Sequence, residues 1–300
     1  MATARKTVLI TGCSPGGIGY EIAKQMHEKE LGFRVLATAR SIESIQTLSS
    51  LGIQSLSLEL NNVDSIAGLL REVEKITNGR LDMLINNAGR NYTVPALDVD
   101  FDDVNDVLQT NTVAVMRMCQ TFAPLLIAAK GTIVQIGSAA ALIRHSIDHI
   151  LSLVRTYTSE TFNPSLMYIP TGVYNASKAA IHAYSNTLRV ELAPFGVKVT
   201  IVVSGRVQSR LSRIKRTLKP DSLYKPMEEE YARRVEHSQG DATPADQFAA
   251  TIVPQLLLAK PPLWVWEGKQ SWTVWFLDGF VPRSRVHSIF LGLFDFSGLK

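Results

Sequence analysis

The sequence predicts an α/β fold: a single domain built on a parallel, doubly wound sheet of mainly seven strands. Short apolar, β-branched runs alternate with helical patterns from residue 6 to about residue 203, and this alternation is typical of a parallel sheet covered by helices. The chain has 300 residues, 46% of them hydrophobic, which suits one α/β domain of ordinary size. No linker, internal repeat or low-complexity segment divides the sequence.

The first strand and the first helix enclose a glycine-rich turn. Lys6–Ile10 is an apolar run that predicts a buried strand, and Tyr20–Glu30 has a helical pattern. Between them lies Thr11-Gly-Cys-Ser-Pro-Gly-Gly-Ile-Gly19. Glycines in this setting let backbone N–H groups approach a pyrophosphate, and the helix N-terminus favours its charge. The alternative is a tight turn without a ligand.

A second turn follows another apolar run. Leu81-Asp-Met-Leu-Ile-Asn-Asn-Ala-Gly89 predicts a buried strand that ends in an Asn-Asn-Ala-Gly turn. Asparagine side chains bond to local backbone and shape turns, while alanine and glycine leave room for a flat ligand. Taken alone, this segment fits a plain turn better than a ligand site.

The segment Tyr174-Asn-Ala-Ser-Lys178 places a phenol and an ammonium four residues apart, on one face of a predicted helix. A nearby ammonium stabilises a phenolate and lowers a pKa that is about 10 when unperturbed. Such a tyrosine can exchange a proton with a substrate oxygen near neutral pH. The same spacing occurs on ordinary helices, so the functional interpretation depends on the two turns described above.

In this order, the three motifs resemble those of the short-chain dehydrogenase/reductase family, over about residues 5 to 267. The resemblance implies a Rossmann-type fold and a catalytic set of Asn111, Ser138, Tyr174 and Lys178. It implies that Tyr174 is the general acid and that Ser138 positions the carbonyl oxygen. Lys178 would lower the pKa of Tyr174 and bind the nicotinamide ribose, and Asn111 would anchor a water in a proton relay.

The resemblance also implies the cofactor-binding residues Gly12, Ser14, Gly16, Gly17, Ile18, Gly19, Arg40, Asn61, Asn87, Ala88, Gly89, Tyr174, Lys178 and Val207. NAD-specific folds usually have an acid after the second strand, where this chain has Arg40. A guanidinium suits a 2′-phosphate, so we expect NADP(H); the alternative is a solvated loop arginine. The chain departs from the family pattern by one extra residue in the glycine turn, by Asn61 in place of an aspartate, and by Ser204-Gly205 in place of Pro-Gly.

A larger departure lies between Ser138 and Tyr174, which about a dozen residues separate in typical family members. Residues 144–167 therefore form an insertion next to the active site. Ile147, Ile150, Leu151 and Val154 have helical spacing within it. Two interpretations stay open: a lid over a large apolar substrate, or a retained intron in the gene model. His145 and His149 also have metal-ligand spacing, but no acid cluster or cysteine accompanies them, and we predict no metal site.

Cysteine content and net charge indicate the cellular compartment and the kinds of partner to expect. The two cysteines, Cys13 and Cys119, do not indicate a disulfide framework, and no signal peptide precedes the first strand. We therefore expect a cytoplasmic protein. The net charge of +4 is too mild to indicate nucleic-acid binding. The basic stretch 206–219 could receive the cofactor phosphate, an anionic substrate or a lipid headgroup, or it could be a solvated helix face.

We divide the chain into a catalytic domain, residues 1–270, and an apolar, aromatic-rich extension, residues 271–300. All four tryptophans lie between Trp264 and Trp275. The apolar runs of the extension are too short to span a bilayer. They suit peripheral contact with the endoplasmic reticulum or a lipid droplet, a subunit interface, or one edge of the substrate pocket. The family resemblance also implies a homodimer or homotetramer.

The expected function is NADPH-dependent reduction of a lipophilic ketone to a secondary alcohol. Ser222-Leu-Tyr-Lys-Pro226 and the tryptophan-rich tail resemble the fungal 1-acyldihydroxyacetone-phosphate reductase branch of the family. That branch implies an acyl phosphate ketone, with steroid-like or secondary-metabolite ketones as further candidates. The alternative is a non-catalytic NADP(H)-binding sensor or scaffold, if the insertion separates Ser138 from Tyr174.

Overall fold

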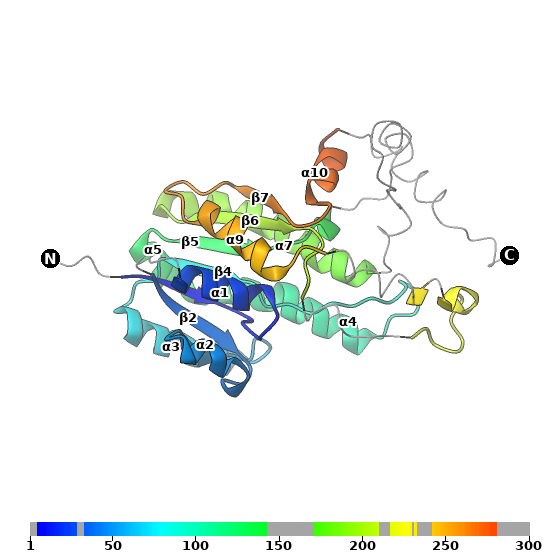
Figure 1. The fold of residues 1–300 in the computed structure, drawn as a ribbon, viewed down its shortest axis with the longest axis horizontal. Helices are drawn as coiled ribbons and strands as arrows, with labels where there is room; N and C mark the ends of the chain where they lie inside the picture. The colour runs from blue at the N-terminus through cyan, green and yellow to red at the C-terminus, as the bar shows by residue number, and fades with distance from the viewer. Residues whose placement is uncertain are drawn as a thin grey trace.

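The computed structural model describes residues 5–28, 33–142, 171–209, 217–229, 231–232 and 242–280. They contain a seven-stranded sheet in the order β3-β2-β1-β4-β5-β6-β7, in which every neighbouring pair is parallel (Figure 1). The strands are β1 (Lys6–Ile10), β2 (Phe33–Ala39), β3 (Gln54–Ser57), β4 (Met83–Asn86), β5 (Thr132–Ile136), β6 (Lys198–Ser204) and β7 (Trp264–Glu267). The predicted doubly wound, parallel α/β fold is confirmed.

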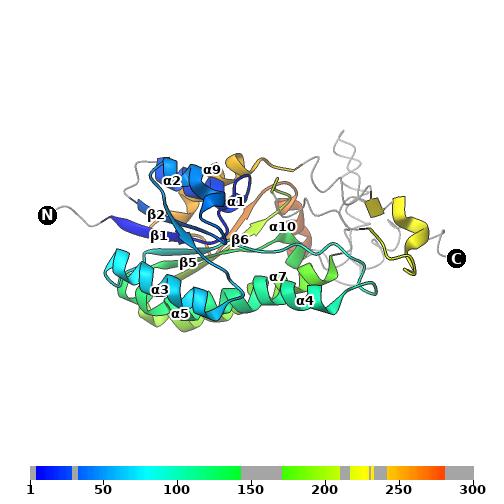
Figure 2. The ribbon, with the colours of Figure 1, turned by 90° about the horizontal axis from the view of Figure 1, so that it is seen from below.

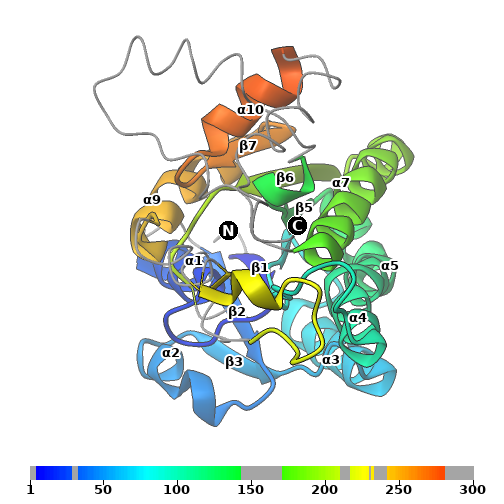
Figure 3. The same cartoon turned by 90° about the vertical axis from the view of Figure 1, so that its right-hand side faces the viewer.

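Helices cover both faces of the sheet (Figures 2 and 3). One face carries α1 (Ile18–Glu28), α2 (Gln46–Ser50) and α9 (Ala245–Leu256). The other face carries α3 (Val63–Thr77), α4 (Phe101–Leu108), α5 (Ala114–Ala129) and α7 (Gly172–Leu192). The strand order reverses direction between β1 and β4, and ligands of such sheets bind beyond the carboxyl ends of the strands at this point.

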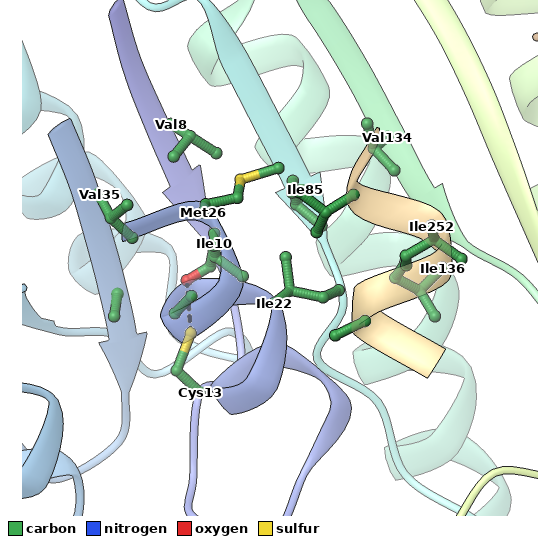
Figure 4. Close-up of a cluster of buried hydrophobic side chains, with 14 of the residues drawn as sticks. Val8, Ile10, Cys13, Ile22, Met26, Val35, Ile85, Val134, Ile136 and Ile252 are labelled. Atoms are coloured by element: carbon green, nitrogen blue, oxygen red, sulfur yellow. Dashed lines mark hydrogen bonds between the residues drawn. The ribbon is translucent and has the colours of Figure 1, made fainter. Parts of the chain in front are cut away.

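The sheet is buried on both faces because successive side chains of each strand point to opposite sides. In β1, Val8 and Ile10 contact the first helix layer, whereas Leu9 contacts the second. Figure 4 shows Val8 and Ile10 beside Ile22 and Met26 of α1. This two-sided burial explains why the strands are continuous apolar runs in the sequence.

The third strand is shorter than the run Gln54–Leu60 predicts. It ends at Ser57. The backbone N–H of Leu58 still donates to the Ala39 oxygen of β2 at 2.9 Å. The Asn62 side chain then caps α3 by accepting hydrogen bonds from the backbone N–H groups of Asp64 and Ser65.

Within the described residues, one continuous helical stretch, Phe101–Ala129, is long and apolar enough to cross a membrane by length and composition alone. It joins α4, the π-helical turn η2 (Gln109–Val113) and α5. Met118, Phe122 and Leu126 are fully enclosed in the core of the second face. The stretch therefore packs as a core helix of the sheet.

The described part of the C-terminal extension is α10 (Ser271–Phe280). Its Val274 is buried in a cluster with Ala139 and with Ile201 and Val203 of β6. Its outer side exposes the aromatic residues Trp272, Trp275, Phe276 and Phe280. Residues 281–300, the insertion 144–167 with its histidine pair and spaced apolar residues, and residues 210–216 of the basic stretch lie outside the described residues.

Candidate active site

The glycine turn and the Asn-Asn-Ala-Gly turn meet at the carboxyl ends of β1 and β4. The Asn87 side chain donates to the backbone oxygens of Thr11 and Gly12, at 2.8 and 2.9 Å. The Thr11 hydroxyl in turn accepts from the backbone N–H groups of Asn87 and Ala88, at 3.0 Å each. The side chain of Asn87 therefore holds the glycine turn in place, and Thr11 is a structural partner absent from the predicted site.

Two positions in this turn require glycine. Gly12 has φ +72°, and a Cβ there would lie 2.8 Å from the Cα of Ala88. A Cβ on Gly19, in the first turn of α1, would overlap the Asn87 amide and lie 2.7 Å from the Gly12 oxygen. The close approach of loop and helix leaves the N-terminus of α1 facing the carboxyl edge of the sheet. This cradle fits a dinucleotide pyrophosphate.

The extra residue of the glycine turn is accommodated at Gly16, which is exposed and has φ +71°. Ser14 precedes it with a partly exposed side chain, and its carbonyl accepts from the N–H of Gly17. Ile18 begins α1 and packs against the core.

Arg40 directly follows β2 and is exposed, and among the described residues its guanidinium forms no ion pair. Asn61 is also exposed, but its side-chain oxygen accepts from the Thr110 hydroxyl at 3.1 Å, which leaves its amide N–H groups to donate. Val207 is buried in the core and bridges to Thr243. Its side chain therefore packs in the hydrophobic core and is not exposed for contact with a cofactor.

The predicted catalytic hydroxyls come together. Tyr174 and Lys178 lie on successive turns of α7, and Ser138 follows β5 and begins the 3-10 turn η3 (Ala139–Ala141). The Ser138 side chain lies close enough to the Tyr174 phenol to affect its pKa. The Lys178 Nζ lies 5.9 Å from the centroid of the Tyr174 ring and donates to the Ile136 oxygen at 2.8 Å. Gly89 adjoins the same ammonium and the side chain of Asn111.

The pKa of Tyr174 differs in direction from the sequence-based expectation. Burial raises the pKa of Tyr174 above its usual value, and the Ser138 side chain opposes this only in part. Burial also lowers the pKa of Lys178 to about 8. The net shift is thus opposite in direction to the one expected from Lys178. Taking both groups out of water favours the neutral form of each. The Tyr174 side chain is partly exposed, so water reduces the amount by which burial raises its pKa.

Asn111 is buried in the π-helical turn η2, a distortion common at functional sites. Its side-chain oxygen accepts from the backbone N–H of Arg90 at 2.7 Å. Its side-chain amide donates to the Arg90 oxygen at 2.9 Å and to the Ser177 hydroxyl at 3.0 Å. The carboxamide is therefore committed to the protein, and it ties the β4 turn to α7.

Sequence reasoning missed His182. It lies one turn beyond Lys178 on the same face of α7, and its Nε2 accepts from the Ser138 backbone N–H at 3.3 Å. The signal was present, because Tyr174, Lys178 and His182 recur at intervals of four residues.

Comparisons with known proteins agree with this geometry. The sequence model of the family described as short chain dehydrogenase matches residues 6–147 and 163–219, and the gap between them falls inside the predicted insertion. The chain is 39% identical over 287 residues to the NADPH-dependent 1-acyldihydroxyacetone phosphate reductase of Schizosaccharomyces pombe, covering 89% of this chain and 87% of that protein. It is 35% identical over 297 residues to the short-chain dehydrogenase srdE of Neurospora crassa, covering 98% and 94%.

A solved short-chain dehydrogenase from Streptomyces avermitilis has the same fold, with a TM-score of 0.72 and 24% identity over 91% of each chain. The chain belongs to the short-chain dehydrogenase family. It is thus an oxidoreductase of the NAD(P)-dependent class, as the sequence motifs predicted.

Proposed function

We propose that this chain is an NADPH-dependent reductase that converts a lipophilic ketone to a secondary alcohol. One observation carries the proposal: the Ser138 side chain lies near the Tyr174 phenol, and Lys178 lies beside the Tyr174 ring. All three lie at the carboxyl edge of the sheet, where the glycine cradle of β1 and α1 also opens. Two hydroxyls so close together can both contact one carbonyl oxygen.

The residues present fit NADP(H). Gly12 and Gly19 let the turn pack closely against Ala88 and Asn87, and this close packing places the glycine turn at the N-terminus of α1, where a pyrophosphate binds in this class of fold. The exposed guanidinium of Arg40 follows β2, where the adenosine ribose binds in this class of fold, and it suits the 2′-phosphate. The name of the S. pombe relative states NADPH dependence, which supports the same choice. When bound, the nicotinamide supplies the hydride for the carbonyl carbon.

The protein residues handle the proton. Because burial raises the pKa of Tyr174, its phenol keeps its proton at neutral pH, which suits a general acid that protonates the carbonyl oxygen. The Ser138 oxygen accepts from the Ala140 N–H at 3.1 Å, so the hydroxyl proton is free to point at the substrate oxygen. Lys178 lies beside the Tyr174 ring, from where it can stabilise the phenolate left by proton transfer.

Asn111 would anchor the relay water through its main chain. Its carboxamide is occupied by Arg90 and Ser177, so its main-chain carbonyl is the group left to hold a relay water. The π-helical turn supports this role because it interrupts the regular pattern of helix hydrogen bonds. Such a water would return a proton to Tyr174 through Lys178.

A relative of this chain and the exposed aromatic residues of α10 both favour a lipophilic substrate. The S. pombe relative is named for an acyldihydroxyacetone phosphate, a lipid ketone. We extend this to a lipophilic ketone of that kind, a steroid-like ketone or a secondary-metabolite ketone. The exposed Trp272, Trp275 and Phe280 of α10 support peripheral contact of a cytoplasmic protein with a lipid surface.

The rival function, a non-catalytic NADP(H)-binding sensor, requires Ser138 and Tyr174 to be apart. Their proximity argues against it. The test is Tyr174→Phe, assayed by NADPH oxidation against a panel of lipophilic ketones that includes an acyldihydroxyacetone phosphate. The variant should lose turnover and still bind NADPH with nearly unchanged affinity. Activity retained in this variant would refute the mechanism, and an inactive wild type with normal NADPH binding would favour the sensor.

A further inference from the structure

The end of β5, which carries Ser138, is held to the catalytic helix by a histidine. His182 and Ser138 are both buried, with 4% and 8% of their surfaces exposed. The Ser138 backbone N–H donates to the imidazole Nε2 at 3.3 Å, across 44 positions of sequence. Because α7 also carries Tyr174, this bond links the two elements that supply the catalytic hydroxyls.

The approach of the imidazole depends on Gly137. A Cβ at this position would overlap His182 Nε2, so a larger residue would displace the ring. The backbone of Gly137 is itself fixed, since its N–H donates to the Val202 oxygen at 2.8 Å and its oxygen accepts from the Ser204 hydroxyl at 2.9 Å. The strand end is therefore anchored to β6 on one side and to α7 on the other.

Two successive turns of α7 reach this strand end. Lys178 Nζ donates to the Ile136 oxygen at 2.8 Å, and His182 accepts from the backbone N–H of Ser138, two residues further along the chain. The Trp264 ring lies at 82° to the imidazole, with centroids 5.4 Å apart, and limits its rotation. The imidazole is thus enclosed between Gly137 and an aromatic ring, in one orientation.

The charge state of His182 is set by its surroundings. Burial, and then the positive charge of Lys178, lower its pKa to about 4. At neutral pH the imidazole is therefore uncharged and Nε2 is free to accept, which places its proton on Nδ1. Within the described part of the chain, Nδ1 is buried and has no hydrogen-bond partner. Among the described residues, therefore, only Nε2 of the two ring nitrogens has a hydrogen-bond partner.

We propose that His182 is a positioning residue, which fixes the Ser138 backbone so that its hydroxyl stays against the Tyr174 phenol. This inference rests on the proposed reductase function. His182 acts through Ser138 and touches neither substrate nor cofactor. Its removal leaves the Ser138 backbone N–H without this acceptor, and a small displacement of a positioning group costs a large factor in rate.

The test compares His182→Leu, which removes the acceptor, with His182→Gln, whose amide oxygen can accept from the Ser138 N–H. Ser185→Ala is the matched control, because Ser185 is fully buried on the same helix and its hydroxyl donates to the Ile181 oxygen of that helix. We expect His182→Leu to lower kcat by about a hundredfold with NADPH affinity within about twofold of wild type. His182→Gln should recover most of the loss, and Ser185→Ala should change little.

Amide hydrogen exchange of the peptide that contains Ser138 gives a readout that does not depend on turnover. Exchange should be faster in His182→Leu and close to wild type in His182→Gln. Unchanged exchange in the leucine variant would overturn the contact. Faster exchange with an unchanged kcat, or a glutamine variant no better than the leucine variant, would overturn the positioning role. Absence of ketone reduction by the wild type would refute the proposed function and, with it, the catalytic part of this inference.

Discussion

Lowering the pH should destabilise this protein through His182, and replacement of His182 should remove that contribution. The pKa of His182 is lowered from 6.5 to about 4 in the folded state, first by burial and then by the charge of Lys178. The unfolded chain therefore binds a proton at a higher pH than the folded chain does. Stability from this group is fully present above about pH 6.5 and is lost as the pH falls toward about 4.

The size of the effect follows from the pKa shift. The full difference between folded and unfolded values corresponds to about 3 kcal/mol. Between about pH 7 and about pH 5, the part of the window that is easily reached, the loss is about 2 kcal/mol. This is a large share of the stability of an ordinary domain.

The assay is chemical unfolding followed by circular dichroism at several pH values, for wild type and for His182→Gln. Carboxyl groups also titrate in this range, so the difference between the two proteins isolates the histidine. The wild type should lose about 2 kcal/mol more than the variant between about pH 7 and about pH 5. Parallel losses in the two proteins would refute the buried, neutral imidazole.

Two further predictions concern the cofactor site. Arg40→Ala should raise the KM for NADPH by about tenfold or more and leave NADH nearly unchanged, because a charge-assisted hydrogen bond to the 2′-phosphate is lost; equal losses for both cofactors would contradict that role. Gly19→Ala should destabilise the fold by about 1–3 kcal/mol in thermal unfolding and weaken NADPH binding, since its Cβ would overlap the Asn87 amide. Gly68→Ala is the control, because a Cβ there meets nothing closer than 3.8 Å, and it should be neutral or slightly stabilising; similar losses in both glycine variants would contradict the cradle.

Much of the fold could be predicted because its signals are local. Apolar runs marked the strands to within a few residues, although β3 ends at Ser57 and β4 begins only at Met83. Tyr174 and Lys178 were placed on one helix face by their spacing alone, and the structure confirms this placement. The motif order and the family resemblance brought Ser138 to the same site.

The rest of the site depends on contacts between distant segments, which spacing does not encode. The direction of the Tyr174 pKa shift is set by burial of the phenol, which the Ser138 side chain opposes only in part. The role of Asn87 likewise depends on the hydrogen bonds of its amide to the Thr11 and Gly12 carbonyls, in the turn that follows β1.

The sequence by itself determined the fold class, the glycine turn, the cationic residue after β2 and the tyrosine–lysine pair, because each depends on residue types within one strand, turn or helix. The tertiary structure decided what surrounds these groups. It brought Ser138 close to Tyr174, committed the Asn111 amide to Arg90 and Ser177, and placed His182 against the Ser138 backbone. Burial and hydrogen-bond partners arise only when separate strands and helices pack together, and they set the protonation and the position of each catalytic group.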